Sequence, residues 1–142
     1  MKENKNINQN CLSISNQCLG VRTRRLSRIT AKIFDDALRP YGIKSTQYTI
    51  LVFIGRMGKS NPKMLGEKLA LEKSSLSRAL KNLQKDALIN IEMISGLQTQ
   101  LSLTKKGNQL IDTTYPVWQS AQAQVKNEVE NLVNDIKVVL DK

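Results

Sequence analysis

One stretch of this chain alternates between apolar and polar residues, although most of the sequence repeats with helical spacing. Residues 89–103 alternate on both sides of Ser95-Gly96. The apolar positions share one parity: Ile89, Ile91, Met93, Leu101 and Leu103. A period of two on either side of a glycine-bearing break predicts a β-hairpin. No charged residue lies between Glu92 and Lys105, so the fold must place one uncharged hairpin among helices.

The parity of the hairpin also constrains its loop. Ile91 and Leu101 face the same side only if the positions of paired residues sum to an even number. A two-residue turn at Ser95-Gly96 would pair position 94 with position 97, which gives an odd sum. We therefore predict a loop of three residues, 95–97, or of five residues, 94–98, with Leu97 near its tip.

Helical spacing of apolar residues predicts the other elements. The expected helices cover residues 12–38, 45–57, 62–69 and 73–86, and a last one begins at Thr104 and continues almost to the C-terminus. Asn61 is suited to cap the helix that begins at Pro62. Pro116 lies inside the last helix and should kink or split it. Residues 1–11 are polar and expected to be flexible, whereas residues 12–142 are expected to form a single, mainly α-helical domain.

Composition excludes several classes of function. The chain has no histidine, and its two cysteines, Cys11 and Cys18, lack the spacing of a metal site. Without a phosphate-binding glycine loop or a suggestive carboxylate pair, we expect no enzyme, no cofactor and no metal. The N-terminus is too polar for a signal peptide and no apolar run could span a bilayer. We therefore expect a cytoplasmic protein that does not enter a membrane.

Positive charge is concentrated in the first part of the chain. The formal charge is +10 and the isoelectric point is about 9.8. Residues 1–110 hold 19 Lys/Arg and 7 Asp/Glu, a net of +12, whereas residues 111–142 hold 3 and 5, a net of −2. We interpret the basic part as a surface for a polyanion and the acidic, heptad-like tail as a self-association element.

The segment 73–86 has the features of a helix that enters the major groove of DNA. It carries an apolar stripe, Leu76, Leu80 and Leu83. The residues expected to contact DNA are Lys73, Ser74, Ser75, Ser77, Arg78, Lys81 and Lys85, with no acidic residue among them. Small hydroxyl groups allow close approach to the groove, Arg78 can bind guanine or clamp a phosphate, and lysines neutralise phosphates. An ordinary surface helix mixes both signs of charge, so this helix and the hairpin that follows it favour a winged helix-turn-helix that binds double-stranded DNA.

Several fragments resemble the MarR family of bacterial transcription regulators. They read LRPYGIKSTQYTIL, LGEKLALEKSSLSRALKNLQKDALI, LSLTKKG and YPVWQSAQAQV, and the resemblance covers residues 18–130. It implies an obligate homodimer in which residues 12–40 and 104–142 are dimerisation helices. Residues 43–103 would form the winged module, with the hairpin as its wing, and bind a palindromic operator. A repressor that a small-molecule effector releases from DNA is the expected function.

The resemblance implies roles for further residues. Pro62 and Lys63, at the start of the supporting helix, should approach phosphates. In the wing, Gln98 and Gln100 are expected to contact only the DNA backbone. A small phenolic or other aromatic anion is the expected effector, and the candidate wall residues are Arg24, Arg28, Tyr48 and Trp118. The other interpretation of these four residues is core packing for the aromatic residues and a solvated or DNA-proximal face for the arginines.

Three positions depart from the family pattern. The wing reads Ser95-Gly96-Leu97 where the family carries an Asp-Arg-Arg-like tip, which predicts little charge in the minor groove. Ala87 stands where the family has a glycine after the recognition helix, and a positive φ there would cost about 1 kcal/mol. Cys18 lies two residues before Gly20, the position that matches the reactive cysteine of the hydroperoxide-sensing branch.

Two alternatives remain open. The uncharged wing is also consistent with a winged-helix protein–protein module, or an antagonist that pairs with a related regulator and no longer reads DNA. Cys18, followed by Arg22, Arg24 and Arg25, is consistent with a thiol-based redox-sensing regulator, because nearby cations lower a thiol pKa. The other reading of Cys18 is a small, inert thiol.

Overall fold

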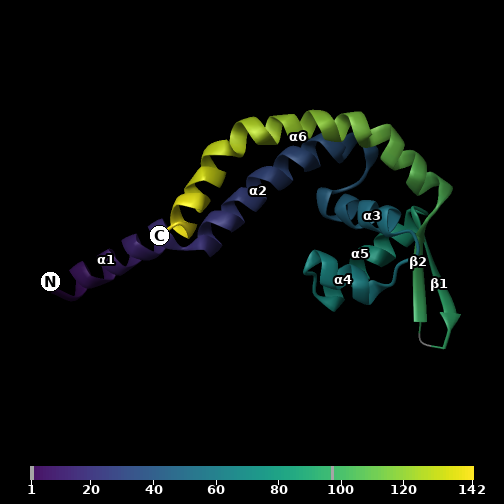
Figure 1. The fold of residues 1–142 in the computed structure, drawn as a ribbon, viewed down its shortest axis with the longest axis horizontal. Helices are drawn as coiled ribbons and strands as arrows, with labels where there is room; N and C mark the ends of the chain where they lie inside the picture. Colours follow the sequence, from purple (N-terminus) through teal and green to yellow (C-terminus); the bar gives the residue numbers. More distant parts are fainter. Residues whose placement is uncertain (1, 97) are drawn as a thin grey trace. The chain divides into compact units, whose positions relative to one another are not determined.

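The structure is a computed structural model that describes residues 2–96 and 98–142 (Figure 1). Its helices are α1 (Lys2–Gln17), α2 (Leu19–Leu38), the 3-10 helix η1 (Arg39–Tyr41), α3 (Ser45–Met57), α4 (Pro62–Leu69), α5 (Lys73–Lys85) and α6 (Lys105–Leu140). Two antiparallel strands, β1 (Ile89–Ser95) and β2 (Gln98–Leu103), form the hairpin. The predicted mainly helical fold with a hairpin wing is therefore confirmed. No described helix combines the length and apolarity needed to cross a bilayer.

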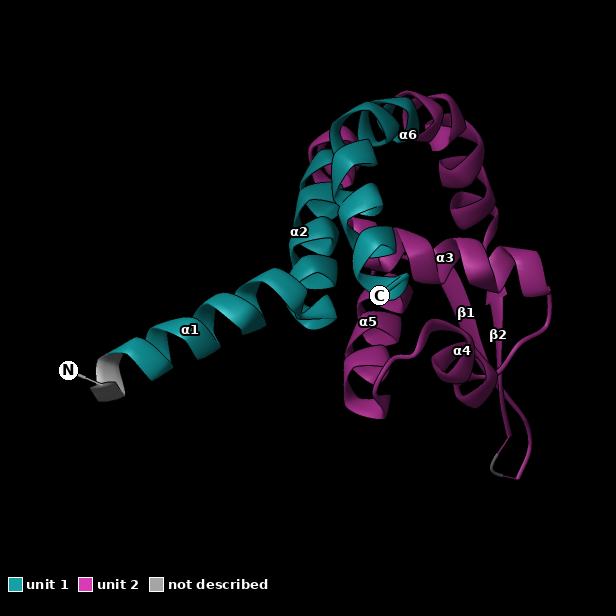
Figure 2. Ribbon diagram, turned by 60° about the vertical axis from the view of Figure 1, so that its left-hand side comes forward, with its two compact units in different colours: residues 1–33, 121–142 teal, residues 34–120 magenta. Residues whose placement is uncertain are grey.

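The chain separates into two compact units (Figure 2). One comprises Phe34–Ser120, and the other combines the N-terminal residues up to Ile33 with Ala121–Lys142. The sequence predicted one domain with internal boundaries near residues 40 and 104. α2 and α6 each continue from one unit into the other, and the single domain with its internal boundaries stays a prediction.

The Phe34–Ser120 unit has a core of aliphatic side chains. Those that are at most 1% exposed are Leu38, Leu51, Ile54, Leu65, Leu83 and Leu101. Full burial of one such side chain contributes roughly 1.5–3 kcal/mol. The predicted stripe of α5 is buried, with Leu76, Leu80 and Leu83 at most 5% exposed. This burial orients the opposite face of α5 toward solvent.

Local signals set the turn between α3 and α4. Both helices have the bounds that the sequence predicted. The Asn61 side chain accepts a hydrogen bond from the backbone N–H of Met64 at 2.9 Å, which satisfies one of the free donors at a helix start. Pro62 occupies the first turn, where a missing N–H does no harm. Gly58 has a φ of 68° after the end of α3, a conformation that favours glycine.

The hairpin has the predicted register but not the predicted loop. Ile91 pairs with Leu101, as parity requires. Near the tip the register shifts by one residue, so that Ser95 pairs with Gln98. The shift is a β-bulge, whose extra residue absorbs the odd count. The strands are thus joined by two residues, and the predicted loop of three or five was wrong; Leu97 itself lies outside the described residues.

A tight turn with left-handed backbone ends α5. Ala87 has a φ of 59°. The N–H of Leu88 donates to the carbonyl oxygen of Leu83 at 3.0 Å, and the N–H of Ala87 donates to that of Gln84 at 2.9 Å. These two bonds form a Schellman motif, in which glycine usually takes the left-handed position. The backbone at this position therefore has the left-handed conformation that glycine favours, although the residue is an alanine.

The start of α6 holds this turn in position. The Thr104 hydroxyl and the Lys106 ammonium donate to carbonyl oxygens of the turn, at 2.6 Å and 2.8 Å. A Cβ added to Gly107 would lie 2.2 Å from the carbonyl oxygen of Leu88, so this close approach requires glycine. The end of α5 is therefore tied to α6 within one unit.

The other unit differs from prediction at its N-terminus. α1 is helical from Lys2 to Gln17, where residues 1–11 were expected to be flexible, and the predicted helix 12–38 is interrupted at Cys18. Ile7, Cys11 and Ile14 extend the helical spacing toward the N-terminus, which accounts for the helix; the flexibility of residues 1–11 stays a prediction.

α6 is a single long helix. Pro116 lies inside it without splitting it. Ala121, Val125 and Val129 are at most 7% exposed, and this part of α6 lies beside α2 in both views (Figures 1 and 2). Part of the face that we assigned to self-association therefore packs within its own chain.

Candidate nucleic-acid interface

The solvent-facing side of α5 collects most of the predicted DNA contacts. Five of them fall within an arc of about 100° at the helical spacing of 100° per residue, opposite the leucine stripe. They are Ser74, Ser77, Arg78, Lys81 and Lys85, and all are exposed. Ser75 is half-buried beside them, and Lys73 is exposed in the first turn. The helix contains no acidic residue, so this face attracts anions along its whole length.

A groove of about 1300 Å³ is bounded by α4, α5 and the wing. It brings together seven of the predicted residues: Pro62, Lys63, Lys73, Ser77, Lys81, Gln98 and Gln100. The other four, Ser74, Ser75, Arg78 and Lys85, lie on α5 but do not line the groove. The predicted set therefore forms one continuous surface of α5 and its neighbours.

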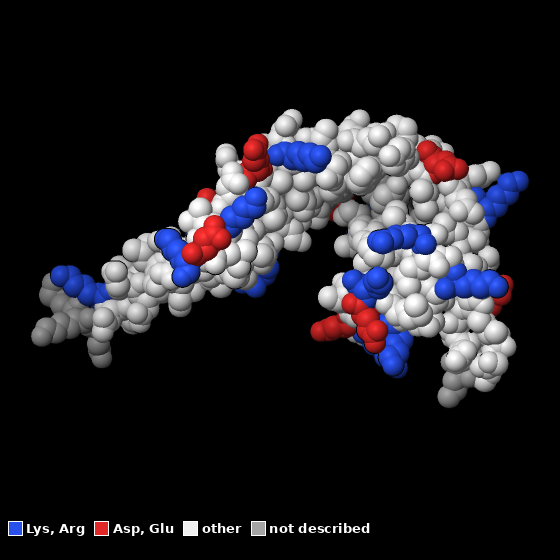
Figure 3. Space-filling model, viewed as in Figure 1, with Lys and Arg blue, Asp and Glu red and all other residues white. Residues whose placement is uncertain are grey.

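Sequence reasoning missed several lining residues of this groove. Lys59 adds a fourth lysine to Lys63, Lys73 and Lys81, and among the described lining residues the only acidic one is Glu67. Lys59 lies two residues before Asn61, the N-cap of α4, which could have indicated its position. Blue side chains, with some red ones among them, lie around α4 and α5, whereas the described lower part of the wing is uncharged on the visible face (Figure 3).

Known proteins with similar sequences assign the chain to a family. A profile described as MarR family matches residues 41–92. The HTH-type transcriptional regulator SarZ of Staphylococcus epidermidis is 30% identical over an alignment of 116 residues that covers 78% of this chain and 78% of that protein. The chain belongs to the MarR family. It is thus a DNA-binding transcription regulator of the winged helix-turn-helix type rather than an enzyme.

Two solved structures share the fold of this MarR-family chain. The M. tuberculosis transcriptional regulator MOSR in complex with DNA superposes with a TM-score of 0.71 at 26% identity, covering 87% of this chain and 97% of that one. A mutant MarR from E. coli complexed with operator DNA gives 0.74 at 18% identity, covering 90% and 95%. For the E. coli structure, an identity of 18% means that the similarity shows only a shared fold.

The residues predicted to line an effector pocket of this MarR-family chain have separate surroundings. Tyr48 is 7% exposed, and its hydroxyl lies 2.8 Å from the Thr114 hydroxyl. Trp118 stacks on a neighbouring tyrosine with ring centroids 5.9 Å apart and packs against the core. Arg24 and Arg28 are exposed and belong to the other unit. Tyr48 and Trp118 therefore contribute to packing, the alternative that their sequence left open.

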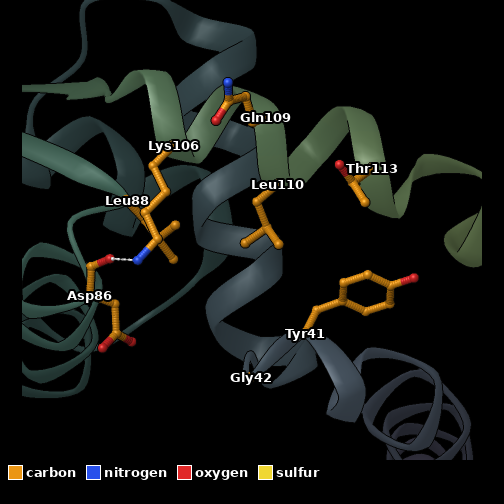
Figure 4. A pocket seen from close by; sticks show the side chains of 8 residues that line it. All are labelled: Tyr41, Gly42, Asp86, Leu88, Lys106, Gln109, Leu110 and Thr113. Atoms are coloured by element: carbon orange, nitrogen blue, oxygen red, sulfur yellow. Dashed lines mark hydrogen bonds between the residues drawn. The ribbon is translucent and has the colours of Figure 1, made fainter.

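A smaller cavity of about 370 Å³ lies where α6 holds the end of α5 (Figure 4). Its lining residues are Tyr41, Gly42, Asp86, Leu88, Lys106, Gln109, Leu110 and Thr113. The Lys106 ammonium donates to the carbonyl oxygen of Asp86 at 2.8 Å, at a helix end where the dipole favours a cation. Lys106 therefore stabilises the end of α5.

Cys18 lies half-buried between α1 and α2. Hydrogen bonds from the backbone of Val21 and Gly20 lower the pKa of its thiol, and the charge of Arg24 lowers that pKa further, whereas partial burial opposes the shift. Arg22 is engaged elsewhere, since its guanidinium lies 3.8 Å from an aspartate carboxylate of α6. The helix start, more than the arginines, therefore favours the thiolate.

Proposed function

We propose that this MarR-family regulator is a homodimeric repressor of a palindromic operator, with α5 inserted into the major groove. The observation that carries the proposal is the acid-free outer face of α5, continuous with a groove lined by four lysines. Major-groove readout needs donors at the start of the helix and cations near the phosphates. Two such modules in a symmetric dimer would read half-sites about one helical turn apart.

Arg78 offers the sharpest test of this proposal. DNA selected from a random pool by the parent protein provides the operator for a titration across salt concentrations. Arg78→Ala should weaken operator binding by about 1–3 kcal/mol and relax the base preference at one position. Arg78→Lys keeps the charge, so it should preserve the salt dependence but lose bidentate readout. Arg39→Ala, the same truncation in η1, is the control; equal affinity of the parent for every sequence would refute specific recognition.

Exposed apolar side chains support the dimer. In the unit that contains both chain ends, more than half of the side chain is exposed at Ile7, Leu12, Ile14, Val138 and Leu140. A second copy would remove such a set from water. Sedimentation should give twice the mass of the chain at micromolar concentration, and a monomer that binds the whole palindrome would contradict the proposed symmetry.

Release by an aromatic anion is the regulatory part of the proposal. Its support is the MarR-family membership together with the exposed cations Arg24 and Arg28, since Tyr48 already has a hydrogen-bond partner. Benzoate is a suitable probe. It should weaken operator binding by the parent and have less effect on Arg28→Ala; an unchanged dissociation constant at millimolar benzoate would argue against this class of effector.

Thiol-based sensing is a second candidate, favoured by the lowered pKa of Cys18. A thiolate reacts with peroxide faster than a thiol. Dilute hydrogen peroxide should then reduce operator binding by the parent and by Cys11→Ser but not by Cys18→Ser. Equal loss in Cys18→Ser would exclude this cysteine as the sensor.

A further inference from the structure

Three exposed apolar side chains meet in the groove between α4, α5 and the wing. Met64 on α4 is 46% exposed, Leu71 in the turn that follows is 37% exposed, and Ile94 on β1 is 58% exposed. Single exposed apolar residues are common, but several that converge in one concave surface mark an interaction site. Phosphates can pair with the lysines of this groove, yet they offer these side chains no apolar surface. The groove therefore has an apolar part for which DNA binding does not account.

The charges around this apolar part indicate the chemistry of a partner. Among the described lining residues the only acidic one is Glu67, and the wing carries no charge between Glu92 and Lys105. Four lysines line the groove, and none of them forms an ion pair with another described residue: Lys59, Lys63, Lys73 and Lys81. A partner that matches both features carries an apolar stripe with carboxylates beside it.

The size of the groove and its backbone pairing indicate the form of this partner. Its volume of about 1300 Å³ exceeds the roughly 300–1,000 Å³ of small-molecule pockets, so a segment of a protein fills it better. The edge of β2 next to α4 is already paired, because Ser60 and Leu101 exchange backbone hydrogen bonds of 3.4 Å and 2.7 Å. A partner strand finds no free backbone there, whereas an amphipathic helix needs only side-chain contacts with such a groove.

We propose that this groove binds an acidic amphipathic helix of a partner protein, and that the bound helix excludes operator DNA. The apolar face of the helix covers the three exposed apolar side chains, and its carboxylates lie against the lysines around α4 and α5. Lys73, Ser77 and Lys81 line the groove and also belong to the predicted DNA-binding residues, so the helix and DNA compete for them. The exclusion of DNA rests on the proposed function, whereas binding of the helix does not.

A designed peptide tests this binding directly. The probe is a fluorescein-labelled helical peptide of about four turns, with leucine along one face and glutamate along the other. Its control is a peptide of the same composition, reordered so that neither residue forms a face. In fluorescence anisotropy the parent protein should bind the amphipathic peptide about tenfold more tightly than the reordered one, because only the first can bury an apolar stripe. Unlabelled operator DNA should displace the bound peptide.

Two neighbouring side chains of β1 provide a matched pair of variants. Ile94 lines the groove, whereas Met93, which is 67% exposed, does not. Ile94→Ser should weaken binding of the amphipathic peptide about tenfold, the loss expected for roughly two buried methylene groups. Met93→Ser should leave this affinity unchanged. Lys63→Gln should reduce the salt dependence of peptide binding, because it removes a charge at the rim of the groove.

Other occupants of the groove give different results. Displacement of the peptide by millimolar benzoate, from the parent and from Arg28→Ala alike, would make the groove a small-molecule site and overturn the inference. A lower mass of Ile94→Ser than of the parent in sedimentation would assign the groove to a second copy of this chain, which would also overturn it. Unchanged thermal midpoints confirm that the variants are folded.

The inference and the proposed function can fail separately. If the parent binds an operator but binds both peptides equally, or if Met93→Ser weakens peptide binding as much as Ile94→Ser, the inference is wrong and the proposed function stands. If operator DNA binds without displacing the peptide, the exclusion of DNA is wrong. If the peptide binds through Ile94 but the parent prefers no DNA sequence, helix binding stands and the proposed function fails.

Discussion

The alanine that ends the recognition helix provides a direct test of the backbone geometry. Ala87 has a φ of 59° and is exposed. A residue with a Cβ in this region loses about 1–2 kcal/mol relative to right-handed backbone. Glycine avoids this loss, but it also raises the conformational entropy of the unfolded chain, which offsets about 0.4–1 kcal/mol of the gain. Ala87→Gly should therefore raise the free energy of unfolding by about 0.5–1 kcal/mol.

Urea unfolding at fixed protein concentration measures this change, since a dimer's stability depends on concentration. The thermal midpoint should rise by about 1–4 °C for a chain of this size. Ala70→Gly serves as a replicate, because Ala70 has a φ of 51° at the end of α4. Ala123→Gly is the control with opposite sign: this exposed residue lies inside α6, where glycine should lower stability by about 1 kcal/mol. A destabilised Ala87→Gly would refute the left-handed turn.

Three other predictions concern the packing or the titration of individual side chains. Gly107→Ala should destabilise by about 1–3 kcal/mol in urea, because its methyl group would meet the carbonyl oxygen of Leu88 at 2.2 Å. Thr114→Val should cost about 1–3 kcal/mol by leaving the buried Tyr48 hydroxyl unpaired; adding Tyr48→Phe should recover most of this loss. The lowered pKa of Cys18 predicts that iodoacetamide alkylates this thiol faster near neutral pH in the folded protein than in the urea-unfolded chain. The stability that the Cys18 thiolate contributes should be fully present at pH values above the ordinary thiol pKa. It should be lost as the pH falls through the lowered pKa of the folded state.

Elements with local signals were predictable from the sequence. The bounds of α3 and α4 are as predicted because Gly58, Asn61 and Pro62 act through their own backbone and nearest neighbours. The length of the hairpin loop was not predictable, because parity constrains only the regular part of the ladder. One unpaired residue at the tip changes the count without changing the register at the base.

The DNA-binding surface was likewise predictable only where its residues lie on one element. The outer face of α5 follows from helical spacing within one element, so its serines, Arg78 and lysines could be named in advance. Lys59 and Ile94 join the groove only because α4, α5 and the wing pack together, and no spacing rule relates residues that far apart. The hydrogen bond between Tyr48 and Thr114 spans 66 positions, which left the buried tyrosine open to assignment as an effector contact.

The division of chemistry between α5 and the wing predicts the salt dependence of DNA binding by the proposed dimer. Four lysines line the groove of each protomer, so a symmetric dimer could neutralise eight phosphates with them and give a log–log slope of about −7. Arg78 and Lys85 could add to this value, but the uncharged segment between Glu92 and Lys105 adds nothing. A titration of the selected operator with potassium chloride measures the slope. A value near −2 would mean that most of the groove lysines do not reach phosphates, and the DNA would then have to lie along α5 alone.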